Sequence, residues 1–94
     1  MYKIELSKKA DKAIRTLPKF IVVLMRNKFE ALSTDISLLK QFDTITNPKS
    51  IGIDETILYK MRVGDYRCLF IVEDAIITIT IIEIEHRSKV YRKK

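Results

Sequence analysis

The sequence has few of the residues that build cross-links and metal centres. It contains one cysteine, Cys68, one histidine, His86, and no tryptophan in 94 residues. A single cysteine excludes an internal disulfide, and one cysteine with one histidine cannot assemble a multi-cysteine zinc site. The carboxylates are scattered, which also argues against a hard-cation site. We therefore expect no metal and no cofactor, and we expect Cys68, within an apolar run, to be a small buried side chain.

Glycine and proline are also scarce, with two of each, while 47% of the residues are hydrophobic. This composition excludes a disordered chain, and the length fits one domain over residues 1–94. Every apolar run is interrupted well before the roughly 18 residues that span a bilayer. The first residues also lack the apolar core of a signal peptide. We expect a cytoplasmic protein with no membrane partner.

Acidic residues are outnumbered, and the net charge is +6. On so small a chain this excess favours a polyanionic partner such as nucleic acid. The end of the chain after His86 holds five cations and no acid: Arg87, Lys89, Arg92, Lys93 and Lys94. Basic tails of this kind also occur simply as solvated ends, so the run alone supports nucleic-acid binding only weakly.

The first half of the chain has the pattern of a strand followed by two helices. Residues 2–6 alternate between apolar and polar, which is typical of a strand. Ser7 is a natural N-cap, and the apolar residues that follow it recur at helical spacing as far as Leu17. Pro18 ends that helix and suits the first turn of the next, which runs to about Leu32.

The second half predicts a β-meander. Residues 43–56 lack a regular pattern and include Asn-Pro and Gly, so we interpret them as a loop. Three strands follow over residues 57–63, 66–72 and 75–85, the first two joined by a turn at Gly64-Asp65. The N-terminal strand must join their sheet, because an isolated strand leaves its backbone groups unpaired. The fold class is therefore α+β: a strand, a helical hairpin and a three-stranded antiparallel meander forming one sheet.

Basic side chains gather on this meander. Lys60 and Arg62 are two apart on its first strand, so they project the same way about 6–7 Å apart. Arg67 opens the second strand and approaches them if its side chain faces the same side. Arg87 leaves the third strand, and Tyr91 follows in the tail. Adjacent antiparallel strands would then form a concave positive surface with one tyrosine.

Such a surface suits RNA, because cations neutralise phosphates and an aromatic ring stacks on an unpaired base. Cleavage through the 2′-hydroxyl needs no metal if cations stabilise the charge on the phosphorus oxygens, but it still needs a base and an acid. His86 alone does not supply the usual pair, and a lysine crowded by cations is a candidate base. In the alternative interpretation these cations only confer solubility and His86 is an ordinary strand-end residue.

Two segments resemble the RelE/ParE toxin superfamily. Residues 59–70 are similar to its signature of a basic strand, a Gly-x-Tyr-Arg turn and an apolar strand. Residues 85–92 resemble its closing His-Arg-x-x-Val-Tyr motif, and Leu17-Pro18 lies where the family has its helical hairpin. The matching segments occur in the same order as in the family and span essentially the whole chain. The sequence is similar to archaeal RelE proteins in particular.

This resemblance implies a toxin of a type II toxin–antitoxin system with a RelE-like, microbial RNase-like fold. RelE members enter the ribosomal A site and cut mRNA there, leaving a 2′,3′-cyclic phosphate. By position in the motifs, Lys60 and Arg62 would hold the phosphate and Arg67 would stabilise the transition state. Arg87 would face the leaving oxygen or the phosphate, and Tyr91 would stack on a base or orient the 2′-hydroxyl.

The acid and base stay unassigned in this picture. Arg62 stands where bacterial RelE often has a lysine, and arginine is effectively always protonated, so Lys60 or Tyr91 would have to be the base. Further RNA or phosphate contacts would come from the end of the chain: His86, Lys89, Arg92, Lys93 and Lys94.

The partners that the resemblance implies are an antitoxin protein, the ribosome with its rRNA, and mRNA. Two alternatives remain within the superfamily. One is a ParE-like toxin that inhibits DNA gyrase without cutting RNA. The other is an inactive relative that only binds an antitoxin.

Overall fold

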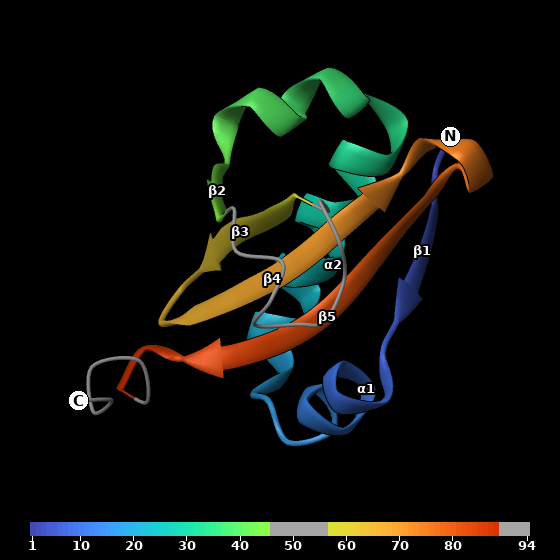
Figure 1. Cartoon of the computed structure of the whole chain (residues 1–94). Helices are drawn as coiled ribbons and strands as arrows, with labels where there is room; N and C mark the ends of the chain where they lie inside the picture. The colour runs from blue at the N-terminus through green and yellow to red at the C-terminus, as the bar shows by residue number, and fades with distance from the viewer. Residues whose placement is uncertain (46–56, 89–94) are drawn as a thin grey trace.

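Five strands form one sheet in the order β1-β5-β4-β3-β2, in which β1 runs parallel to β5 and the other neighbours are antiparallel (Figure 1). The computed structural model describes residues 1–45 and 57–88. The elements of these residues are β1 (Lys3–Leu6), α1 (Lys8–Ile14), α2 (Lys19–Thr34), the 3-10 helix η1 (Ile36–Gln41), β2 (Asp43–Ile45), β3 (Leu58–Val63), β4 (Tyr66–Glu73), the 3-10 turn η3 (Asp74–Ile76) and β5 (Thr78–His86).

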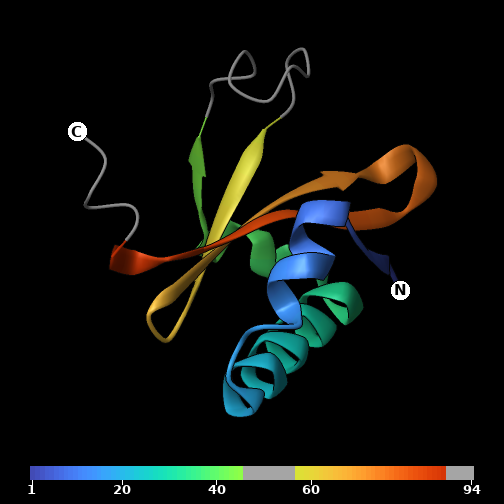
Figure 2. The same cartoon turned by 90° about the horizontal axis from the view of Figure 1, so that it is seen from below.

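The helical hairpin covers one face of the sheet (Figure 2). Helix α2 begins after Pro18, as the sequence predicts, and buries a stripe at helical spacing: Ile21, Met25, Phe29 and Leu32. The stripe packs against the side chains of β3, β4 and β5 that face it. Phe70 of β4 is fully buried at the centre, with its ring centroid 5.1 Å from that of Phe29 in an edge-to-face contact. Burial of these rings contributes to the apolar stabilisation of the fold.

The pairing of β4 with β5 contains a β-bulge. Leu69 pairs with Glu83, but the next residue, Phe70, pairs with Ile81, so Ile82 is an extra residue in β5. Before the bulge Ile79 and Ile81 face the helices; after it Ile84 does. Because side chains alternate along a strand, the extra residue exchanges the two faces of β5 from this point on.

Ser7 holds the bulge in place. Its hydroxyl accepts a hydrogen bond from the backbone N–H of Ala10 at 3.0 Å, which caps α1 as the sequence predicts. The same hydroxyl donates to the backbone oxygen of Ile82 at 2.6 Å. The N–H of Ser7 also donates to the oxygen of Ile81 at 2.9 Å. One residue therefore satisfies the start of the helix and the irregular backbone of the strand beside it.

The predicted α+β fold class is confirmed, and the N-terminal strand and the three-stranded meander do form one sheet. The prediction that residues 43–56 form a loop is wrong at its start, because Asp43–Ile45 pair with β3 as strand β2. The third meander strand begins later than predicted. Residues Asp74–Ile76 form a 3-10 turn, and Ile77 follows with φ 48°, a left-handed conformation that is unusual for a branched residue. Apolar β-branched residues continue through this turn, which is why the pattern alone extends the strand too far.

Within residues 1–45 and 57–88, no helix has the length and apolar character needed to cross a membrane.

Replacing Ser7 by Ala is expected to lower the free energy of unfolding by about 1–2 kcal/mol, because it removes a helix cap and leaves the bulge carbonyl without its donor. Urea denaturation measures this change. Ser7→Thr keeps a hydroxyl at the position and is expected to lose less than half as much. Equal losses in both variants would contradict the assignment of the effect to the hydroxyl.

Candidate functional site

The sheet face opposite the helices carries the predicted basic residues of β3 and β4. Met61 and Val63 of β3 lie in the helix-side core, so the alternating residues Lys60 and Arg62 project from the other face. Among the described residues no helix lies on that face (Figure 2). We call this surface the open face. On the same face the side chains of Leu58, Leu69 and Ile71 are buried in a second apolar cluster.

Arg62 and Arg67 are directly opposite each other on this face. They are cross-strand partners in the β3–β4 pair, joined by the turn at Gly64, whose φ is +60°. Partner side chains in such a pair start only about 5 Å apart, so the two guanidinium groups repel each other unless an anion lies nearby. The structure therefore brings together these two residues, as the sequence predicts.

Glu85 supplies one such anion from the third strand. It is the register partner of Arg67 on β5, and its Oε1 lies 3.2 Å from Nη2 of Arg67. Both side chains are about three-quarters buried, with exposed fractions of 29% and 26%. The Nε of Arg67 is buried and has no hydrogen-bond partner among the described residues. A row Arg62–Arg67–Glu85 thus crosses three strands of the open face.

A second row lies beside the first. Lys60 pairs with Asp43 of β2 on one side and with Leu69 of β4 on the other, and Leu69 pairs with Glu83 of β5. Glu83 also forms an ion pair with Lys9 of α1 at 3.3 Å. Lys60 is half-buried, whereas Arg62 is exposed. Cations therefore occupy the centre of the open face, and carboxylates flank them on both sides.

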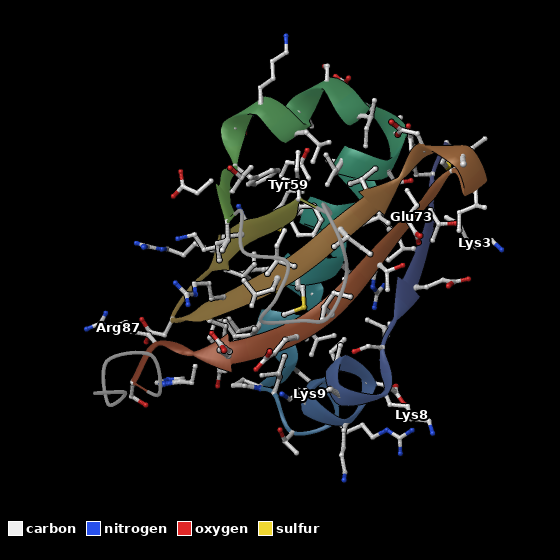
Figure 3. All side chains as sticks on the ribbon, viewed as in Figure 1. Lys3, Lys8, Lys9, Tyr59, Glu73 and Arg87 are labelled. Atoms are coloured by element: carbon white, nitrogen blue, oxygen red, sulfur yellow. The ribbon has the colours of Figure 1, made fainter. Side chains whose placement is uncertain are left out.

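Arg87 lies just beyond the end of β5. Its backbone N–H donates to the oxygen of Asp65 in the β3–β4 turn at 2.7 Å, and its Nη1 lies 3.6 Å from Oδ1 of Asp65. The side chain is 64% exposed and projects outward from the end of the strand (Figure 3). The structure places it beyond the row of Arg67 and Glu85, at the edge of the same region.

His86 is not brought to the basic residues of the open face. It pairs with Tyr66, whose ring lies on the helix side, and the two rings meet edge-to-face at 4.9 Å. Its Nδ1 accepts a hydrogen bond from the N–H of Ser88 at 3.0 Å. The predictions for Tyr91, Lys89, Arg92, Lys93 and Lys94 lie outside the described residues.

The sequence analysis did not identify Glu85 as a site residue. The signal that would have found it is the doubled isoleucine Ile81-Ile82, which breaks the alternation of β5 and marks the bulge. Without the bulge Glu83 and Glu85 would share the face of Ile79 and Ile81, inside the core. With it, both carboxylates face outward beside the cations.

The arrangement is suited to binding a phosphodiester. Two adjacent guanidinium groups offer several N–H donors in fixed forks, the geometry that phosphate oxygens prefer. The flanking carboxylates limit the excess positive charge and can also exchange a proton. Among the described residues, no cluster of three His, Cys, Asp or Glu side chains could hold a metal ion.

Cys68 lies beneath this face, in the helix-side core, and is fully buried as predicted. Burial raises the pKa of its thiol to about 12. The thiol therefore stays protonated at neutral pH and does not act as a nucleophile.

Comparison with protein-family models gives one match, over residues 4–91, to the ParE toxin of the type II toxin–antitoxin system parDE. No curated protein sequence matches the chain.

Several solved toxin structures share the fold. The RelE–RelB complex of Pyrococcus horikoshii is archaeal; it aligns over 94% of this chain and 97% of that one, with 26% identity and a TM-score of 0.70. The isolated E. coli RelE toxin aligns over 99% and 94%, with 18% identity and a TM-score of 0.73. The RelBE2 complex of Mycobacterium tuberculosis aligns over 92% and 98%, with 22% identity and a TM-score of 0.70. The last two likenesses concern the fold alone.

The buried thiol leads to a pH dependence of stability. Above its ordinary pKa of 9.0 the thiol ionises in the unfolded chain but not in the folded one, so the folded state binds more protons and its stability falls toward pH 12. Cys68→Ala has no such group. The difference in unfolding free energy between wild type and Cys68→Ala is therefore constant below about pH 8 and shrinks as the pH rises from there. Urea titrations at several pH values test this, and a difference that stays constant to high pH would contradict the burial of the thiol.

Proposed function

The chain belongs to the ParE toxin family of type II toxin–antitoxin systems, within the RelE/ParE superfamily, and from this premise we propose that it is a ribosome-dependent endoribonuclease. The observation that carries the proposal is the cationic centre of the open face, where Arg62 and Arg67 are cross-strand partners and Lys60 lies in the neighbouring row. Two arginines at paired positions offer several N–H donors to the oxygens of one phosphate.

The proposed reaction is attack of an RNA 2′-hydroxyl on the adjacent phosphorus, which leaves a 2′,3′-cyclic phosphate. Arg62 and Lys60 hold the scissile phosphate, and Arg67 stabilises the negative charge that grows on its non-bridging oxygens. Donors fixed in advance in a partly water-excluded site are worth more than donors in water, because they need no reorganisation during the reaction. The fixed charge of Arg67 replaces the electrostatic contribution that a metal ion makes in other nucleases.

Action on the ribosome follows from the likeness to RelE rather than from the geometry of the open face. The structural relative with 26% identity is an archaeal RelE, bound to its RelB partner. By analogy this chain would cut mRNA in the A site and so inhibit translation in the cytoplasm. Its net charge of +6 would favour contacts with rRNA around that site.

An antitoxin is the expected protein partner. The structures of related toxins include RelE–RelB and RelBE2 toxin–antitoxin complexes. On this chain helix α2 leaves three large apolar side chains exposed on its outer side, namely Phe20, Val23 and Leu24, with exposed fractions of 66%, 47% and 43%. Exposed apolar residues gathered on one helix are typical of a protein-binding surface. The other side of this helix lies in the core, through Met25 and Phe29.

The second candidate function is inhibition of DNA gyrase. The family model that matches describes ParE toxins, and the carboxylates Asp43, Glu83 and Glu85 offset part of the charge of the open face. A DNA-supercoiling assay with purified protein separates this function from RNA cleavage, because a gyrase poison leaves mRNA intact.

Arg67→Ala is expected to lower the rate of mRNA cleavage by roughly 100-fold or more, the usual cost of losing one charge-stabilising donor. The measurement is primer extension on mRNA bound to translating ribosomes, with the protein added in excess. Wild type should produce new 5′ ends within the A-site codon and none on free mRNA.

Arg15→Ala is the matched control. Arg15 is also an arginine in an ion pair, with Asp11 at 3.0 Å, but it lies on the exposed side of α1. This variant should cut at the wild-type rate. Intact mRNA with wild-type protein, together with loss of supercoiling by gyrase, would overturn the nuclease proposal in favour of the ParE-type function.

A further inference from the structure

Glu85 has a position that the binding of phosphate alone does not explain. It reaches the open face only because of the bulge at Ile82, and it contacts Arg67 at 3.2 Å while three-quarters buried. A carboxylate in that position weakens the positive field of the two arginines, which is a disadvantage if the site only binds phosphate. An anion kept in contact with a cationic site therefore calls for a role of its own.

We propose that Glu85 is the general base that takes the proton from the attacking 2′-hydroxyl. The inference rests on the proposed nuclease function and adds to it the residue that starts the reaction. Arg62 and Arg67 are effectively always protonated and cannot accept a proton. Glu85 lies in the same row as the two arginines, and its carboxylate can accept a proton. It is on β5, the strand next to Arg67, and so lies one strand away from the phosphate that the arginines would hold.

The other carboxylates of the open face are less suited to this role. Glu83 is one row away and is held by Lys9 of α1 at 3.3 Å. Asp43 lies on the far side of Lys60, on the edge strand β2, and is exposed. Of the carboxylates on this face in the described residues, only Glu85 forms an ion pair with an arginine proposed to stabilise the transition state. Proton transfer and charge stabilisation would thus be coupled through one contact.

Water is the only further reactant that this step requires. The 2′-oxygen forms a bond to phosphorus while its proton moves to Oε1 or Oε2 of Glu85, and the bond from phosphorus to the 5′-oxygen breaks. The 5′-oxygen leaves with the electron pair of that bond and takes a proton from water. Glu85 then returns its proton to solvent. The products are a 2′,3′-cyclic phosphate and a 5′-hydroxyl, and Arg67 offsets the extra charge on the phosphorane oxygens in between.

Charged and titratable groups surround Glu85 on every side. Arg67 faces it from β4, with Arg62 of β3 beyond. Glu83 and Arg87 flank it along its own strand, and His86 lies between Glu85 and Arg87 on the opposite face. A groove at the edge of β5 is lined by Lys9 and Lys12 of α1 together with Tyr66, Glu83, Glu85 and His86.

The test is the pH profile of single-turnover cleavage on ribosome-bound mRNA, between about pH 6 and pH 9. Glu85→Gln should lose about 100-fold or more near neutral pH, and its remaining rate should rise with hydroxide concentration more steeply than the wild-type rate does. Glu85→Asp keeps the carboxylate on a shorter side chain and should retain the pH dependence of wild type at a reduced rate.

Glu73→Gln is the matched control, because it removes an exposed carboxylate at the end of β4 that lies far from Arg67. Its rate and pH profile should be those of wild type. Urea denaturation of each variant establishes that the fold is kept; the partly exposed pair with Arg67 is expected to contribute only about 1 kcal/mol or less.

A purely positioning role for Glu85 gives a different result. In the Glu85→Gln variant the new amide oxygen still accepts a hydrogen bond from Arg67, so the rate would fall by less than about tenfold with the pH dependence of wild type, and the proposal would be overturned. A substrate whose scissile 5′-oxygen is replaced by sulfur tests whether Glu85 acts as the general acid instead, because the sulfur leaves without needing a proton. Recovery of Glu85→Gln on that substrate would also overturn the proposal, whereas no recovery supports it.

The failure of this inference is distinguishable from failure of the proposed function. If wild type leaves ribosome-bound mRNA intact, the nuclease assignment falls and Glu85 has no 2′-hydroxyl to deprotonate. If wild type cuts and Glu85→Gln cuts within about tenfold of it, only the role of Glu85 is overturned.

Discussion

The register of β5 against β4 is the constraint on which the candidate site depends. The bulge at Ile82 exchanges the faces of β5 halfway along the strand, so that Ile79 and Ile81 enter the core before it and Ile84 enters the core after it. The same exchange turns Glu85 outward to meet Arg67. Ser7 stabilises the bulge by donating to its carbonyl oxygen while it caps α1. The Ser7 hydroxyl at the start of α1 therefore stabilises the backbone arrangement that places Glu85 on the open face.

The second constraint is the turn between β3 and β4. Gly64 has φ +60°, and a Cβ atom there would lie 2.9 Å from Cδ1 of Ile21 on α2. The turn is thus both left-handed and in close contact with the helix, which a larger residue would disturb. Its shortness makes Arg62 and Arg67 direct partners. A turn longer by one residue would send the side chain of Arg67 to the helix side, where Cys68 now lies.

The sequence was sufficient for much of this arrangement. Ser7 and Pro18 predict the helix starts, and strict alternation predicts that Lys60 and Arg62 share a face. The partnership of Arg62 with Arg67 follows once the two-residue turn is accepted. The short strand β2 was missed because three residues carry too little periodicity, and their pairing is decided by β3. Glu85 was missed because a bulge reverses alternation, and His86 was included because it stands next to the basic end of the chain.

The central claim is that the open face promotes attack by a 2′-hydroxyl on its own phosphodiester. Its most direct test places a single 2′-deoxynucleotide at the scissile position of an otherwise normal mRNA in the ribosomal A site, followed by identification of the 3′ end that cleavage leaves. The account predicts a 2′,3′-cyclic phosphate from the all-ribose mRNA and no cleavage of the substituted one. Cleavage of the deoxy-substituted mRNA at the same position would contradict it, because the nucleophile would then have to come from elsewhere.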